Sequence, residues 1–251
     1  NDRSVFFQDG NISLLHNPED LLKYLLQLKE KNNKSEHLII KMRRESFGGK
    51  DVYKVNVNKL KTDKSFLHDI YNTITKDAYI IQDFIIQNKE INMLNPHSVN
   101  TMRMTTYTNK NHETKVLPTL IRTALSDIHV DNIGRGGGFI PIDIEKGTYT
   151  NKLYSDFEKN TGEIYTKHPL TGYDFKDQPV PFFKEAKEMA LKAAQSVPEV
   201  HLVGWDIAFQ DDGPVIIEGN LLPMLHELEI ISRGAKNDPA LHELVQHIQS
   251  T

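Results

Sequence analysis

The sequence predicts an α+β fold with antiparallel sheets, and three observations lead to this prediction. Strand-like and helix-like segments follow one another in an irregular mixture, without the steady strand–helix alternation of a doubly wound parallel sheet. Neighbouring strand-like segments are separated by short polar or glycine-containing turns, which connect antiparallel strands. The chain has 251 residues, enough for one large domain or two smaller ones with a sizeable core.

The first third of the chain is expected to contain two helices and three strands. Residues 17–20, Asn-Pro-Glu-Asp, supply a capping side chain, a first-turn proline and two acids, so a helix is predicted over 18–31. Apolar runs at 37–42 and 52–57 enclose the Ser46-Phe47-Gly48-Gly49 stretch, which predicts a hairpin with a glycine-containing tip. A further helix and a strand that ends in a hinge are predicted over 64–75 and 79–85.

The rest of the chain alternates between strands and loops before it ends in a helix. Two strands are predicted over 99–108 and 115–125, and a glycine-rich loop precedes a third over 139–144. Residues 150–180 have no sustained period and predict a long irregular excursion, a feature that often shapes a binding site. The remaining elements are a helix from 181 to about 195, paired strands over 200–209 and 215–218, and a last helix capped by Asp238-Pro239.

Composition excludes several classes of protein. Thirty basic and 34 acidic side chains give a net charge of −4, so no global positive field attracts a nucleic acid. No apolar run approaches the ~20 residues that span a bilayer, so no membrane-spanning segment is expected. The absence of cysteine excludes disulfides and thiolate metal sites and favours a reducing cytoplasm. Because the chain opens at Asn1 without a signal segment, it is expected to be a piece of a longer protein.

The sharpest chemical signal is a carboxylate pair in the hairpin over 204–220. A turn centred on Asp212 would place Asp206 opposite Glu218, with Asn220 on the same face. Like charges directly opposite on a sheet destabilise it by up to ~1 kcal/mol, so a cation is the natural compensation. Two carboxylates and an amide oxygen suit Mg²⁺ better than Zn²⁺. A register slip of one residue would break this opposition and leave a solvated hairpin.

Two glycine-containing stretches are candidates for phosphate binding. Lys41 ends an apolar strand, and the glycines of 46–49 would let backbone N–H groups approach phosphate oxygens. The alternative is an exposed edge lysine followed by an ordinary turn. Arg135 lies among the glycines of 131–138, a run that a mobile loop closing over a phosphoryl group requires and a rigid turn does not.

Arg103 and Arg122 lie on two strands that are expected to be neighbours. A turn near residue 111 places them roughly opposite each other, and two facing guanidinium groups attract an anion between them. The alternative is that each arginine pairs with a local acid such as Asp127.

The order of these parts resembles the ATP-grasp superfamily. The parts are a strand lysine, a glycine hairpin, a hinge strand, two arginines, a glycine-rich loop and the acidic pair. Within the superfamily, the chain resembles the sugar-transfer-associated, teichuronopeptide-biosynthesis-like branch, found in surface-polysaccharide gene clusters. The motifs that carry this closer resemblance are 95–103 (Asn-Pro-His-Ser-Val-Asn-Thr-Met-Arg), Val130-Asp131-Asn132 and 203–208 (Val-Gly-Trp-Asp-Ile-Ala). The resemblance runs from about residue 36 to 222.

The resemblance implies an ATP-grasp fold, in which two α+β subdomains with antiparallel sheets clasp the nucleotide. Residues 1–86 would form the small subdomain, which could include a remnant of a missing N-terminal domain. Residues 87–251 would form the large subdomain with the magnesium and substrate site. The implied cofactors are ATP and Mg²⁺.

The resemblance also implies roles for individual residues. The candidates for binding ATP are Lys41, Ser46, Gly48, Gly49, Gln82, Asp83, Phe84, Ile85 and Glu90. The candidates for binding Mg²⁺ are Asp206, Glu218 and Asn220. The candidates for binding the transferred phosphoryl group and the substrate carboxylate are Arg103, Arg122 and Arg135.

The activity implied is that of an ATP- and Mg²⁺-dependent carboxylate–amine ligase, which forms an amide through an acyl phosphate. The carboxylate would be a uronic acid or an amino acid in capsule or surface-polysaccharide synthesis. One alternative is an ATP-grasp kinase that phosphorylates a sugar or alcohol. Another is a non-catalytic nucleotide-binding module of a larger glycosyltransferase. The expected partners are the small-molecule carboxylate and amine, with a glycosyltransferase fused to the chain or working with it.

Overall fold

The structure is a computed structural model that describes residues 5–8, 10–32, 35–43, 52–127, 136–155 and 162–249. The chain divides into two compact units, Asn1–Ile86 and Gln87–Thr251. Every strand pair in the described ranges is antiparallel, and the helices are interspersed with the strands. The predicted α+β class with antiparallel sheets is confirmed. Within the described residues, no helix combines the length and the apolar character that a membrane-spanning helix needs.

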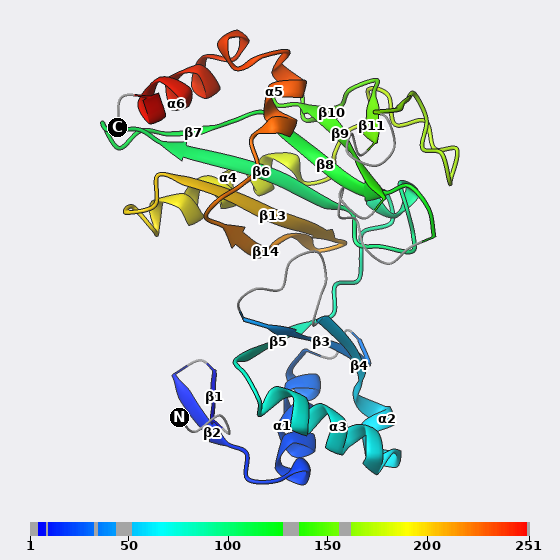
Figure 1. The fold of residues 1–251 in the computed structure, drawn as a ribbon. Helices are drawn as coiled ribbons and strands as arrows, with labels where there is room; N and C mark the ends of the chain where they lie inside the picture. The colour runs from blue at the N-terminus through cyan, green and yellow to red at the C-terminus, as the bar shows by residue number, and fades with distance from the viewer. Residues whose placement is uncertain are drawn as a thin grey trace. The chain divides into compact units, whose positions relative to one another are not determined.

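The first unit is built on a three-stranded sheet, counted over its described residues, in the order β4-β3-β5. Its strands are β3 (His37–Met42), β4 (Val52–Asn56) and β5 (Tyr79–Asp83). Its helices are α1 (Pro18–Asn32), α2 (Val57–Thr62) and α3 (Lys64–Ile74), and they lie on one side of the sheet (Figure 1). Leucine and isoleucine side chains from the helices pack against Leu38, Ile40 and Val55 of the sheet to form the core.

Capping side chains mark where these helices begin. The Asn17 side chain accepts a hydrogen bond of 2.8 Å from the Asp20 backbone N–H at the start of α1, as predicted. Asn56 caps α2 and Asp63 caps α3 in the same way. Helix α2 was not predicted, because its residues continue the alternating pattern of the strand before it. The cap at Asn56 ends that strand.

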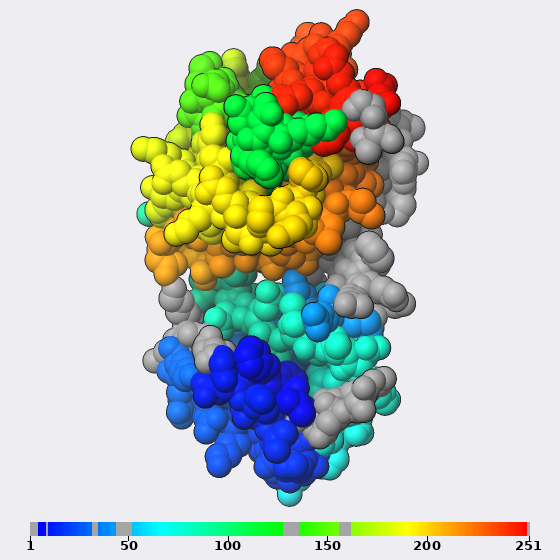
Figure 2. All heavy atoms as spheres, turned by 90° about the vertical axis from the view of Figure 1, so that its left-hand side faces the viewer, coloured from blue at the N-terminus to red at the C-terminus, as the bar shows by residue number. Residues whose placement is uncertain are grey.

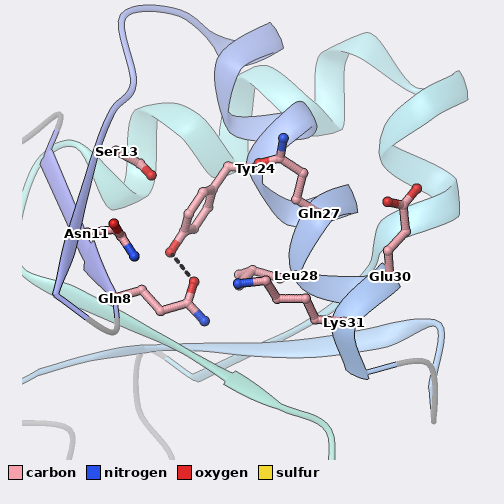
Figure 3. Close-up of a pocket in the computed structure, with 8 residues that line it drawn as sticks. All are labelled: Gln8, Asn11, Ser13, Tyr24, Gln27, Leu28, Glu30 and Lys31. Carbon is pink, nitrogen blue, oxygen red and sulfur yellow. Dashed lines mark hydrogen bonds between the residues drawn. The ribbon is translucent and has the colours of Figure 1, made fainter.

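A separate hairpin precedes the sheet in the first unit and was also not predicted. It consists of β1 (Val5–Gln8) and β2 (Asn11–Leu14). A hollow of about 410 Å³ lies between this hairpin and α1 (Figure 3). Tyr24 of α1 donates a hydrogen bond of 3.3 Å to Gln8 of β1 across the hollow (Figure 3). None of the predicted site residues lines it.

The second unit is built on a nine-stranded sheet, counted over its described residues. The order is β12-β11-β9-β8-β6-β13-β14, with β10 paired to β9 and β7 paired to β6. The first strands along the chain are β6 (Thr101–Thr108), β7 (Thr114–Val116), β8 (Thr119–Ala124) and β9 (Gly137–Asp143). The others are β10 (Thr148–Tyr149), β11 (Leu153–Ser155), β12 (Ile164–Tyr165), β13 (Leu202–Gln210) and β14 (Gly213–Asn220).

Helices pack on both faces of this sheet. They are α4 (Phe183–Gln195), α5 (His226–Ser232) and α6 (Pro239–Gln249). Three buried alanines of α4 share the main core with Met102, Met104 and Ile207, and Figure 2 shows α4, in yellow, at the surface on this side. Helices α5 and α6 share a second core with Tyr107. Because alternate residues of β6 point to opposite faces, Arg103 and Tyr107 both face the α5 side.

Some helices and strands of the second unit differ from those that the sequence predicted. The helix predicted from 181 begins at Phe183. The excursion predicted over 150–180 contains the short strands β11 and β12 and the fully buried Phe175, so it is more ordered than its pattern indicated. Helix α6 follows the predicted cap, since the Asp238 side chain accepts a hydrogen bond of 2.8 Å from the Leu241 backbone.

Candidate active site

One face of the small sheet carries Lys41 and Gln82. Leu38 and Ile40 of β3 point into the core, so Lys41 points to the opposite face. The strand register puts Gln82 opposite Ile39, on the same face as Lys41. Lys41 is only 8% exposed and sits on the central strand. The alternative of an exposed edge lysine is therefore wrong.

Lys54 lies on this face too and was missed by sequence reasoning. It is opposite Ile39 on β4, and its Nζ atom lies 4.3 Å from the centre of the Phe84 ring. This is a cation–π contact that holds the lysine over the chain just after β5. The sequence could have indicated this position of Lys54, because the alternation over 52–57 places Val52, Lys54 and Asn56 on one face of the strand.

The other predicted ATP-binding residues fall in different places. Asp83 is the exposed last residue of β5, and Ile85 is half-buried. Glu90 belongs to the second unit. The pKa of Tyr173 is raised mainly by the burial of Tyr173, and the negative charge of Glu90 adds to this rise. Four predicted site residues lie outside the described residues, namely Ser46, Gly48, Gly49 and Arg135.

In the second unit, Asp206 of β13 and Glu218 of β14 are direct cross-strand partners. The predicted turn centre at Asp212 is wrong, because Gln210 pairs with Gly213 and the turn consists of Asp211 and Asp212. A β-bulge next to Asp206 shifts the register by one residue and restores the predicted opposition.

Asn220 joins this pair. Its Nδ2 atom donates hydrogen bonds of 3.2 Å to the Asp206 Oδ2 atom and to the Gly204 carbonyl. Asp206 is buried, whereas Glu218 is exposed. Asn220 thus contacts Asp206 through its amide nitrogen, and Glu218 lies across the strand pair from Asp206.

Two arginines converge on Asp206. Arg103 is its direct partner on β6, and the Arg103 Nε and Nη2 atoms donate hydrogen bonds of 2.6 and 3.0 Å to the two carboxylate oxygens. Arg122 on β8 lies opposite Thr101, which is two residues before Arg103 on β6, so both arginines share one face of the sheet. The Arg122 Nη1 atom is 3.6 Å from Asp206 Oδ2. The anion between the two guanidinium groups is thus Asp206, rather than the local acid Asp127 that the alternative named.

Burial and charge act against each other in this cluster. Burial tends to raise the pKa of Asp206, but the Arg122 charge and the Arg103 hydrogen bond outweigh it and hold the pKa below its usual range. Burial likewise tends to lower the pKa of Arg103, and the hydrogen bond to Asp206 outweighs it, so that pKa is raised. Both groups are ionised at neutral pH.

A buried polar network ties β6 to β8 and was missed as such by sequence reasoning. Asn95 donates hydrogen bonds of 2.8 Å to the carbonyls of Ala124 and Ser126, and Asn100 donates one of 2.9 Å to the Asn95 carbonyl. Thr123 donates a hydrogen bond of 2.7 Å to Asn100. These bonds fix the strands that carry Arg103 and Arg122. The two asparagines were noted only as part of the 95–103 motif.

This combination of sheets, with its acidic hairpin and paired arginines, is that of an ATP-grasp protein, since a family model of that kind matches residues 38–249. The match covers most of the chain, which therefore belongs to the sugar-transfer associated ATP-grasp family. No curated protein matches the chain in sequence.

Distant similarity to solved structures accompanies the family match. An N5-carboxyaminoimidazole ribonucleotide synthetase in complex with ADP has 12% identity and a TM-score of 0.47, covering 83% of this chain and 39% of the other. The enzyme from Thermus thermophilus has 12% identity and a TM-score of 0.46, covering 88% and 42%. The ADP complex from Staphylococcus aureus has 11% identity and a TM-score of 0.44, covering 79% and 38%. The chain spans about two fifths of the length of these synthetases.

Proposed function

We propose that this chain is an ATP- and Mg²⁺-dependent carboxylate–amine ligase that forms an amide through an acyl phosphate. The observation that carries the proposal is the opposition of Asp206 and Glu218, with Asn220 beside them and Arg103 and Arg122 next to Asp206. Membership of the ATP-grasp family supports the use of ATP. The carboxylate substrate would be a uronic acid or an amino acid used in capsule or surface-polysaccharide synthesis.

Asp206, Glu218 and Asn220 would hold Mg²⁺. Carboxylate and amide oxygens are the ligands that this hard cation prefers, and the exposed side of Glu218 leaves room for water. In the described part of the chain, no three carboxylate or imidazole side chains gather as a metal site, so the set depends on the Asn220 amide oxygen. When bound, Mg²⁺ would offset the negative charge of the phosphates.

The arginines would act on the charge that develops during the reaction. Arg122 Nε is buried and has no hydrogen-bond partner among the described residues, so it can donate to a substrate oxygen. Arg103 is held in place by Asp206 and would stabilise the transferred phosphoryl group. Arg135 would contribute a third positive charge.

The nucleotide would be bound by the residues that the family resemblance indicates. Lys41 and the 46–49 segment would bind the phosphates, while the 83–85 backbone would pair with adenine. The side chains of Gln82 and Glu90 would contact adenine and ribose. The shared face of Lys41, Lys54 and Gln82 supports this assignment, and Lys54 adds a second cation to it.

Two displacements would follow. A substrate carboxylate oxygen attacks the γ-phosphorus of ATP, an O–P bond forms, and the bond to the ADP oxygen breaks. The amine nitrogen then attacks the acyl carbon, a C–N bond forms, and phosphate leaves with the electron pair while the nitrogen loses a proton. The protein would contribute mainly position and charge neutralisation.

The proposal is tested by ADP release from the full-length protein with a panel of uronic acids and amino acids, each with amine acceptors. Hydroxylamine added to the productive mixture should yield a hydroxamate, because only an acyl phosphate reacts in this way. ADP release with sugars or alcohols and no hydroxamate would indicate the kinase instead. An Asp206→Asn variant with unchanged product formation in a glycosyltransferase complex would indicate the non-catalytic module.

The absence of cysteine agrees with a cytoplasmic enzyme.

A further inference from the structure

Glu227 is a buried carboxylate that the proposed ligase chemistry leaves without a role. It lies in the first turn of α5 and is 2% exposed. Its Oε2 atom has no hydrogen-bond partner among the described residues. Burying a carboxylate without a full set of partners costs stability. Departures from the rule that buried charges are paired often occur at functional sites.

The chain that leads into α5 packs beside Arg103. A Cβ atom at Gly204 would lie 2.8 Å from Pro223 Cβ and 3.2 Å from Arg103 Cδ, so both side chains close over this glycine. Glu227 follows Pro223 by four residues, and the next residue, Leu228, packs with Tyr107. Tyr107 lies on the same face of β6 as Arg103. Helix α5, which carries Glu227, therefore lies on the same side of the sheet as Arg103.

The charges on this face explain why a second carboxylate is needed. Asp206 is the ion-pair partner of both Arg103 and Arg122, and the proposed function also assigns it to Mg²⁺. One carboxylate would then serve three cationic centres. The Glu227 charge already acts on Arg103, because it adds to the rise in the pKa of Arg103 after the contribution of Asp206.

We propose that Glu227 is a positioning residue for Arg103, the second counter-ion that keeps this guanidinium in place when Asp206 shares its oxygens with Mg²⁺. The inference rests on the proposed function for the role of Arg103. The electrostatic partnership itself is a property of the folded chain and can be measured without a substrate.

The first test is the NMR signal of the Arg103 Nε–H group in protein labelled with ¹⁵N-arginine. The chain contains seven arginines, and an Arg103→Lys variant assigns the signal by its loss. In Glu227→Gln, the Arg103 signal should move by more than its line width and exchange with water at least fivefold faster. The signal of Arg233 should stay unchanged. The matched control is Glu229→Gln, an exposed residue of the same helix, which should move neither signal.

The second measurement separates positioning from a structural role. Because the Glu227 carboxylate is incompletely paired, Glu227→Gln should keep or raise the melting temperature. Glu227→Asp keeps the negative charge, so its Arg103 signal should lie between those of the wild type and Glu227→Gln. A fall in melting temperature of more than about 5 °C would show a structural role and overturn the proposal. An unchanged Arg103 signal in folded Glu227→Gln would overturn it as well.

The kinetic test applies once a substrate pair is known. Glu227→Gln should lower kcat at least tenfold and leave the KM for ATP within about twofold, as expected when transition-state contacts alone are lost. An unchanged kcat would contradict the inference. If the wild-type protein releases no ADP with any substrate pair, the ligase proposal fails while the NMR result still decides the partnership of Glu227 and Arg103.

Discussion

Arg103 and Asp206 stand directly opposite each other on β6 and β13, and two hydrogen bonds of 2.6 and 3.0 Å join them. A planar guanidinium that meets both oxygens of a carboxylate forms one of the strongest and most directional ion pairs in proteins. Here the pair is buried, so neither partner can be satisfied by water if the other is removed. The pair therefore links the stability of the sheet to the chemistry of the site.

An Asp206→Asn variant should lose both stability and activity. It removes the carboxylate charge that pairs directly with both Arg103 and Arg122, and breaking a buried pair in this way costs about 3 kcal/mol. We expect the free energy of unfolding in urea to fall by that amount and Mg²⁺-dependent ADP release to fall about 100-fold. The control is Asp174→Asn, an exposed partner of Lys167 that should cost less than about 0.5 kcal/mol. A variant as stable as the wild type would contradict the importance of the pair.

A Lys41→Met variant should lose nucleotide binding and keep its fold. Lys41 is buried on the central strand, so an apolar side chain of similar length should leave the unfolding free energy within about 1 kcal/mol. We expect the Kd for Mg²⁺·ADP, measured by calorimetry, to rise at least tenfold, which corresponds to about 1.4 kcal/mol. Lys61→Met, an exposed position in the same unit, is the control and should bind like the wild type. Equal binding by both variants would remove Lys41 from the nucleotide site.

The sequence predicted those features that depend on neighbouring residues. The cap at Asn17 and the alternation along β3 are local, and both appear in the structure. The opposition of Asp206 and Glu218 was predicted from a turn centre that is wrong by half a residue, and the bulge beside Asp206 compensates for the error. A strict two-residue period cannot reveal a bulge, because the extra residue adds no signal of its own.

The pairing of Arg103 with Asp206 could not be predicted from the sequence. The two residues are about a hundred positions apart, and no turn links β6 to β13, so nothing local sets their register. Helix α5, which carries Glu227, was missed for another reason. It has seven residues, and Leu225 at its start makes no capping hydrogen bond through its side chain. A short helix without a cap has no start signal for sequence reasoning to find.

Acid should weaken the fold through His168. This side chain is buried, its Nε2 atom lies 3.0 Å from the Ala124 carbonyl, and burial holds the pKa of His168 below its usual value. A histidine whose pKa is lowered in the folded state contributes stability that is present above its unfolded pKa of about 6.5. That stability is lost as the pH falls through the lower folded value. We expect the unfolding free energy to decrease below about pH 6.5, and to decrease less in His168→Gln, which cannot take up the proton. Parallel pH profiles for the two proteins would exclude this role.

An Asn100→Ala variant should loosen the strands that carry both arginines. The Asn100 side chain is fully buried, accepts a hydrogen bond from Thr123 and donates to the carbonyls of Ile91 and Asn95, so its removal takes away three buried hydrogen bonds. A buried hydrogen bond contributes about 1 kcal/mol net, so we expect the free energy of unfolding to fall by about 3 kcal/mol. The exposed Asn111→Ala is the matched control and should stay within about 0.5 kcal/mol of the wild type.

Because the network joins the start of β6 to the end of β8, its loss should also disturb the spacing of Arg103 and Arg122 around Asp206. The Nε–H signals of both arginines should therefore broaden or shift in Asn100→Ala at temperatures where the variant is still folded. If the stability falls while both arginine signals keep their positions, the network supports the sheet without positioning the site.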